Sequence, residues 1–195
     1  MYKRLIILGT WAFLFASQSI AQDHIKAGLK GGFSLTTLRG PEHGFKPGFQ
    51  FGGVVVLGAN EPVFFQTELL LTQKGSWGTE GSKNNFGLFY IEIPLMLGVE
   101  ITEKFFMNAG FQPAYLLSGS YSTPNGGQSE YTNSLNKFDY STLISAEYYL
   151  KTNFFMGIRY THGFVPITEN YALSSRNGQL PVNRLFGIYC GYMLR

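Results

Sequence analysis

Three histidines and a single cysteine are the residues of this 195-residue sequence best suited to acid–base or nucleophilic chemistry. A lipid-modifying enzyme would need one of them beside a nucleophile such as serine and an orienting acid. His24 and His43 lie outside the apolar segments, and His162 lies near the end of one, where no serine shares its face. Cys190 lies in an apolar segment and is expected to be an ordinary hydrophobic residue. We therefore predict no catalytic residues, with a lipid-modifying enzyme as an alternative.

The charged residues suit ion pairing instead. Five of them fall on the more polar face of segments that alternate between apolar and polar residues: Lys30, Glu68, Glu92, Glu147 and Arg159. An isolated charge in a confined interior is costly, so these mixed signs predict an interior network of ion pairs. The sequence has no metal-ligand spacing, glycine-rich phosphate loop or paired-carboxylate motif, and we expect neither a metal nor a cofactor.

Composition limits the fold class that could position these residues. The sequence is 45% hydrophobic and 16% aromatic, contains 24 glycines, and is only 14% charged, against about 25% in typical soluble chains. This mixture favours β-structure over a helical bundle. The net charge of +3 excludes a strongly basic nucleic-acid-binding surface, and one cysteine excludes an intrachain disulfide.

The N-terminus has the pattern of a secretory signal peptide. Lys3 and Arg4 precede an apolar run over residues 5–15, and small and polar residues follow up to Ala21. A membrane-anchoring helix is the alternative, but the run is shorter than the roughly 20 residues that span a bilayer. We predict cleavage after Ala21, which leaves one domain over residues 22–195.

The rest of the chain alternates at period two, which is typical of strands with one apolar face. In residues 25–35, for example, the odd positions are mostly apolar and the even positions are polar or small. The alternation predicts eight strands, over residues 25–35, 48–58, 63–74, 88–99, 105–117, 138–148, 154–164 and 185–194.

The connections between these segments alternate in length. Three are short (residues 59–62, 100–104 and 151–153) and four are long (residues 36–47, 75–87, 118–137 and 165–183). Short periplasmic turns, long outer loops and aromatic residues at both ends of the apolar faces are typical of outer-membrane barrels. We predict an all-β, eight-stranded, antiparallel up-and-down transmembrane β-barrel. Because alternation does not distinguish lipid from protein, a two-layer or soluble β-structure is the alternative.

One segment carries a family resemblance. Residues 90–97, Tyr-Ile-Glu-Ile-Pro-Leu-Met-Leu, resemble a strand of the PorT-like outer-membrane β-barrel family of Bacteroidota, and residues 109–117 and 157–163 are similar to two further strands of it. The resemblance covers residues 22–195 and implies an eight-stranded outer-membrane barrel in a family named after a member tied to protein secretion. The sequence departs from the usual terminal aromatic of such barrels, since it ends Tyr192-Met193-Leu194-Arg195.

These observations predict a monomeric protein of the outer membrane of a Gram-negative bacterium, in contact with outer-membrane lipid and not with nucleic acid. We expect a structural or interaction role, such as an accessory in envelope assembly or protein secretion. An envelope or secretion partner would bind the outer loops, and the candidate contacts there are Tyr121, Glu130, Tyr131, Tyr171 and Arg176. Two further hypotheses are a narrow channel and a soluble ligand-binding barrel, although an eight-stranded interior has room only for side chains.

Overall fold

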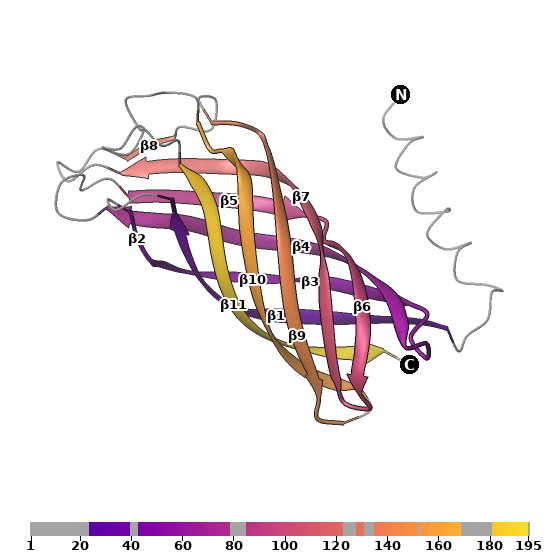
Figure 1. The fold of residues 1–195 in the computed structure, drawn as a ribbon. Coiled ribbons are helices and arrows are strands. Elements are labelled where there is room, and N and C mark those ends of the chain that lie inside the picture. The colour runs from indigo at the N-terminus through magenta and orange to yellow at the C-terminus, as the bar shows by residue number, and fades with distance from the viewer. Residues whose placement is uncertain are drawn as a thin grey trace, which may run out of the picture.

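The computed structural model describes residues 24–39, 43–78, 85–122, 128–130, 135–151, 153–168 and 181–194. These residues form eleven strands (Figure 1). The strands are β1 (Ile25–Leu38), β2 (His43–Gly44), β3 (Lys46–Leu57), β4 (Val63–Gly78), β5 (Asn85–Glu92), β6 (Leu95–Thr102), β7 (Phe105–Ser122), β8 (Gln128–Glu130), β9 (Phe138–Tyr149), β10 (Phe154–Pro166) and β11 (Val182–Leu194). Among the described residues, no helix is long and apolar enough to cross a membrane.

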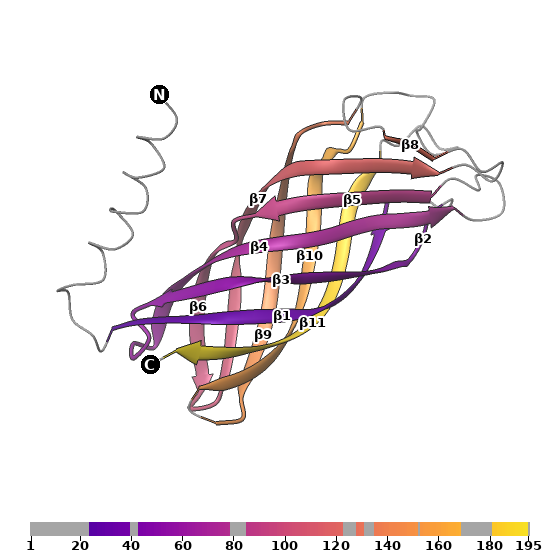
Figure 2. The ribbon, with the colours of Figure 1, turned by 180° about the vertical axis from the view of Figure 1, so that it is seen from behind.

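The long strands form one closed antiparallel barrel, which confirms the predicted fold class. Around the wall the order is β4, β3, β1, β11, β10, β9 and β7, and β5 and β6 both fill the gap between β7 and β4. The first and last strands pair with each other over most of their length, from Ala27 opposite Leu194 to Leu38 opposite Asn183. Figure 2 shows the wall from behind. Closure pairs the two edges that an open sheet would leave exposed.

One predicted strand is interrupted. The continuous strand expected over residues 88–99 is wrong, because β5 ends at Glu92 and β6 begins at Leu95. Pro94 lies between them and has no amide hydrogen to donate. The ladder still continues across the break, since the Glu68 amide donates to the Pro94 carbonyl at 3.1 Å and the Ile93 amide donates to the Pro113 carbonyl at 2.9 Å. The two pieces therefore occupy one position in the wall.

The strands extend farther into the predicted outer loops than the sequence indicates. β4 continues to Gly78, β7 continues to Ser122, and β8 pairs with the end of β7 inside the segment predicted to be the third loop. The predicted boundaries are too short because they follow apolar contrast, whereas backbone hydrogen bonds continue a strand whatever its side chains. Both ends of the barrel chain, the start of β1 and the end of β11, lie at the end with the short turns (Figure 1).

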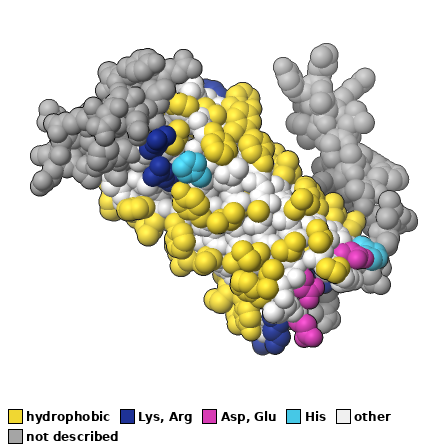
Figure 3. Space-filling model, viewed as in Figure 1, with side chains coloured by type: hydrophobic (Ala, Val, Ile, Leu, Met, Phe, Trp, Pro, Cys, Tyr) yellow, Lys and Arg dark blue, Asp and Glu magenta, His cyan; other side chains and the backbone are white. Residues whose placement is uncertain are grey.

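The two faces of the wall differ as the alternation predicts. The outward face is apolar and exposed, with Phe33 74% and Leu97 64% accessible, so the two-layer alternative, which would bury this face, is wrong. Hydrophobic side chains are spread over the wall visible in Figure 3. Exposed aromatic side chains lie toward both ends of this face: Phe33, Phe49, Tyr115, Phe138, Phe164 and Phe186 toward the outer end, and Tyr148, Phe154 and Tyr192 toward the other.

Two neighbouring glycines of β3 differ in the space that a side chain would have. A Cβ atom on Gly52 would overlap the Leu69 carbonyl oxygen of β4, whereas a Cβ atom on Gly53 would have only the Gly28 carbonyl oxygen near it, at 3.8 Å. We expect Gly52→Ala to lower the free energy of unfolding by about 1–3 kcal/mol, the usual cost of overpacking. Urea unfolding in lipid vesicles, followed by circular dichroism, measures the change. Gly53→Ala is the matched control, and an equal loss in both variants would contradict the expectation.

Candidate functional site

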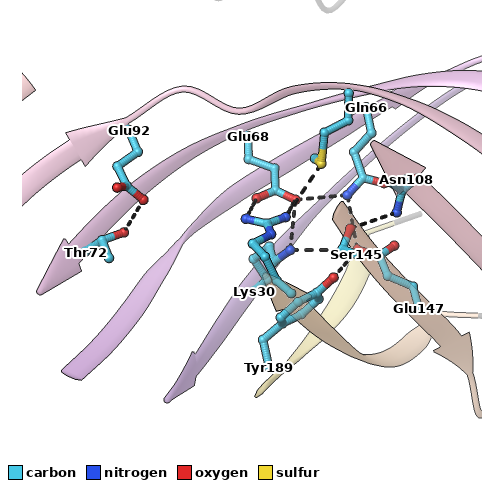
Figure 4. Close-up of polar contacts among 11 residues, drawn as sticks. Lys30, Gln66, Glu68, Thr72, Glu92, Asn108, Ser145, Glu147 and Tyr189 are labelled. Carbon is cyan, nitrogen blue, oxygen red and sulfur yellow. Dashed lines mark hydrogen bonds and ion pairs between the residues drawn. The ribbon is translucent and has the colours of Figure 1, made fainter. Parts of the chain in front are cut away.

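The centre of the barrel holds three charged side chains in direct contact. Glu68 of β4 accepts two hydrogen bonds from the Arg159 guanidinium of β10, both at 2.8 Å, and a third from the Lys30 ammonium of β1, also at 2.8 Å (Figure 4). All three residues are at most 3% exposed. The bidentate contact matches the planar guanidinium to the planar carboxylate and holds both side chains in one orientation.

A second carboxylate balances the remaining positive charge. Glu147 of β9 lies 3.8 Å from the Lys30 nitrogen and accepts a hydrogen bond from the Tyr189 hydroxyl at 2.8 Å. Gln66 joins the two carboxylates, because its amide donates to Glu68 at 2.9 Å and to Glu147 at 3.2 Å. We call Lys30, Gln66, Glu68, Glu147, Arg159 and Tyr189 the central cluster. Its two cations face two carboxylates, so the charges compensate one another.

A separate group of polar residues lies nearer the outer end. The Lys74 ammonium is 2.6 Å from Glu92 and 3.4 Å from Asp139. Glu92 also accepts a hydrogen bond from Thr72 at 2.7 Å, and Asp139 accepts one from Asn183 at 2.8 Å. We call these five residues the outer cluster. Figure 4 shows Glu92 and Thr72 apart from the residues around Glu68.

The structure thus divides the five charged residues predicted for the interior between two clusters. Four lie in the central cluster, and Glu92 lies in the outer one. The alternation places Lys74 and Asp139 on the inward faces, but the predicted network omits both. The signal that could have found them is the same alternation that selects Glu68, since Lys74 lies six residues farther along the same face of β4.

Apolar clusters lie on either side of these polar groups. Toward the outer end, eight buried residues pack together: Leu38, Phe86, Leu88, Tyr90, Ala114, Leu116, Leu135 and Ile167. Toward the short turns, the packed residues are Val54, Val56, Phe64, Phe155, Tyr189 and Met193. A cavity of about 570 Å³ opens at the short-turn end, and its lining includes Phe64, Phe106 and Tyr149 as well as Glu147. The arrangement fills the middle of the barrel and suits a structural role better than ion passage.

The structure describes the backbone of two of the five predicted loop contacts. Tyr121 and Glu130 belong to strands β7 and β8, whose backbones pair within the connection predicted over residues 118–137. Tyr131, Tyr171 and Arg176 lie outside the described residues.

The described histidine side chains lie outside the barrel interior. The Nδ1 atom of His162 lies 3.2 Å from the Tyr160 hydroxyl on the outer face, and the ring of His162 contacts the ring of Phe164. His24 is exposed, with Nδ1 3.9 Å from Glu61. In the described part of the chain, no group of three histidine, cysteine or acidic side chains is arranged to hold a metal ion.

Comparisons with known proteins agree with this geometry. Residues 17–169 match the family model described as outer membrane protein beta-barrel domain. No curated protein matches the sequence closely enough to count as a relative. Ail of Yersinia pestis, solved in complex with the heparin analogue sucrose octasulfate, is 10% identical with a TM-score of 0.54, over 88% of this chain and 99% of Ail. Neisserial surface protein A is 11% identical with a TM-score of 0.57, over 86% of this chain and 96% of that protein. At these identities the likeness concerns the fold.

The central cluster predicts a large and specific cost for removing Glu68. Glu68→Gln leaves Arg159 and Lys30 buried with one carboxylate between them, and we expect a loss of about 3–5 kcal/mol in the free energy of unfolding, measured by urea titration in vesicles. Adding Lys30→Gln restores the charge balance, so the double variant should lose less than the sum of the two single losses. Glu103→Gln, at an exposed turn position, is the control. Additive losses would contradict a coupled cluster.

Proposed function

Because the chain belongs to the outer membrane protein beta-barrel domain family, we propose that it is a closed anchor in the outer membrane that holds an interaction surface at its outer end. The observation that carries the proposal is the compensated central cluster, which fills the barrel between two apolar clusters. In a barrel filled in this way, the outer surface and the two ends are available for binding, whereas the lumen is not.

The outer end is the part best suited to recognition. Connections on a rigid barrel are where binding residues usually lie, and the four connections at this end are the longer ones. The long strands β4 and β7 support this end, and β8 adds a short paired strand to it. The residues proposed for contact with a partner are Tyr121, Glu130, Tyr131, Tyr171 and Arg176.

The finer assignment is an accessory role in envelope assembly or protein secretion, without catalysis. Its support is the resemblance of residues 90–97 to the PorT-like family, which is a narrower group than the matched family model covers. The proposal includes removal of residues 1–21 as a signal peptide. It also includes a monomeric state, which is supported by the fact that strands of a single chain close the wall.

Conductance distinguishes a filled anchor from a narrow channel. We expect the purified protein in planar lipid bilayers to show no steady single-channel current, because the central cluster occupies the cross-section. Discrete current steps in the wild-type protein that change in Arg159→Gln would establish a channel and overturn the anchor proposal. A heat-shifted band on denaturing gels confirms in each preparation that the barrel has inserted.

Complementation tests the outer surface. In a strain that lacks the protein, we expect the wild-type chain to restore the envelope and the profile of secreted proteins, measured by detergent sensitivity and by gel analysis of the culture medium. A variant with Tyr131→Ala, Tyr171→Ala and Arg176→Ala should insert normally but fail to complement. Full complementation by this triple variant would contradict the proposed contacts. Lys104→Gln, at an exposed turn on the opposite end, is the control.

A further inference from the structure

The cavity at the short-turn end has the size of a binding site for a small molecule. Its volume is about 570 Å³, and pockets for small ligands usually measure about 300–1,000 Å³. The turns between β3 and β4, β6 and β7, and β9 and β10 contribute Ala59, Lys104 and Lys151 to its lining. This end faces the periplasm in barrels of this kind, so the cavity is separate from the outer surface proposed for a partner.

Aromatic side chains line part of this cavity. The Phe106 ring packs edge to face against the rings of Phe64 and Tyr149, with centroids 5.8 Å and 5.1 Å apart. Phe106 and Tyr149 are only half-buried, so part of each ring is accessible from the opening. The face of such a ring attracts an ammonium group that lies within about 6 Å of its centroid.

The inner part of the cavity is lined by a carboxylate. Glu147 lies two residues before Tyr149 on the same face of β9. Its Oε1 atom accepts two hydrogen bonds within the central cluster and lies 3.8 Å from the Lys30 ammonium, whereas Oε2 takes part in none of these contacts (Figure 4). The Lys30 ammonium is closer to Glu68, at 2.8 Å. Glu147 is therefore the carboxylate of the central cluster whose cation is more distant, and its 1% exposure leaves little water to compete for it.

The protein already holds one ammonium group with this combination of side chains. The Lys30 nitrogen lies 3.6 Å from the centroid of the Tyr189 ring and 2.8 Å from Glu68. A ring face and a carboxylate together replace part of the hydration that an ammonium loses on burial. Tyr149 and Glu147 provide the same two groups nearer to the opening.

We propose that this cavity binds a small primary amine, in which an ammonium group is carried on a short apolar chain. The ammonium donates a hydrogen bond to Oε2 of Glu147 and lies against the Tyr149 ring. The apolar chain lies along Phe106 toward the opening. Acidic and basic side chains lie next to each other at this end, so a cation is not excluded from it (Figure 3). A carboxylate ligand at the same depth would be repelled by Glu147.

A nuclear magnetic resonance titration of the full barrel in phosphatidylcholine nanodiscs tests the proposal, with pentylamine as the probe. The methyl signal of Met193, which lines the cavity, should shift saturably, whereas that of Met107, on the lipid face, should not. Pentanol and pentanoate should bind at least about tenfold more weakly, because a hydrogen bond between charged groups is lost. Equal binding of pentanoate, or no saturable shift of Met193, would overturn the proposal.

Two variants test the two groups that hold the ammonium. Glu147→Gln should weaken pentylamine binding at least about tenfold. Because this change also disturbs the central cluster, Tyr149→Leu gives a second test, and we expect it to weaken binding about threefold to tenfold. Tyr148→Leu is the matched control, since it removes the same ring from the outward face of β9, away from the cavity. Equal losses in the two tyrosine variants would contradict the proposed site. A heat-shifted gel band establishes that each variant is folded.

A lysine variant distinguishes an amine from an anion. Lys26→Gln with Lys151→Gln removes two basic groups of the lining and should leave pentylamine binding unchanged or tighter. Weaker binding in this variant would show that the lysines hold the ligand, and would overturn the proposal. The blocked tripeptide Gly-Lys-Gly carries the same amine on a peptide. Tighter binding of this peptide than of pentylamine would overturn the assignment to a small free molecule.

Discussion

The absence of water from a lipid bilayer governs this structure. Every backbone amide and carbonyl of a spanning segment must find a partner within the protein, and for strands this requires a closed ladder. Here β1 pairs with β11 from Ala27 to Leu38, and the ladder continues past the break at Pro94 because the Pro94 and Pro113 carbonyls accept hydrogen bonds there. A closed barrel with eight strand positions has an interior only wide enough for side chains. Polar side chains inside it must therefore find partners among themselves, as they do in the two polar clusters.

The central cluster ties closure to register. Glu68 meets Lys30 and Arg159 only when β1, β4 and β10, which are widely separated in the sequence, have all taken their places. A slip of one residue in any of these strands would turn its charged side chain toward lipid. The cluster therefore penalises misaligned barrels more strongly than an apolar filling would. An apolar cluster separates its charges from the outer end, whereas Glu147 lines the cavity that opens at the short-turn end.

Much of this fold could be predicted from alternation alone, because a wall with lipid on one side and packed side chains on the other imposes period two on every strand. Alternation also places Glu68 and Arg159 inward. It cannot say which inward residues meet, since that depends on the register between strands. For this reason the predicted network places Glu92 in one set with four residues of the central cluster and omits Lys74, with which Glu92 pairs. The break at Pro94 and the outer ends of the strands could not be predicted, because they depend on backbone hydrogen bonds and the apolar pattern does not report these.

The positions of β4 and β10 make the Glu68–Arg159 contact a link between two distant parts of the wall. In the order of the wall, four steps separate these two strands in either direction, so they lie on opposite sides of the barrel. Two hydrogen bonds, each 2.8 Å, thus join side chains that reach across its diameter. Any deformation of the wall that moves β4 and β10 apart must therefore break these two hydrogen bonds.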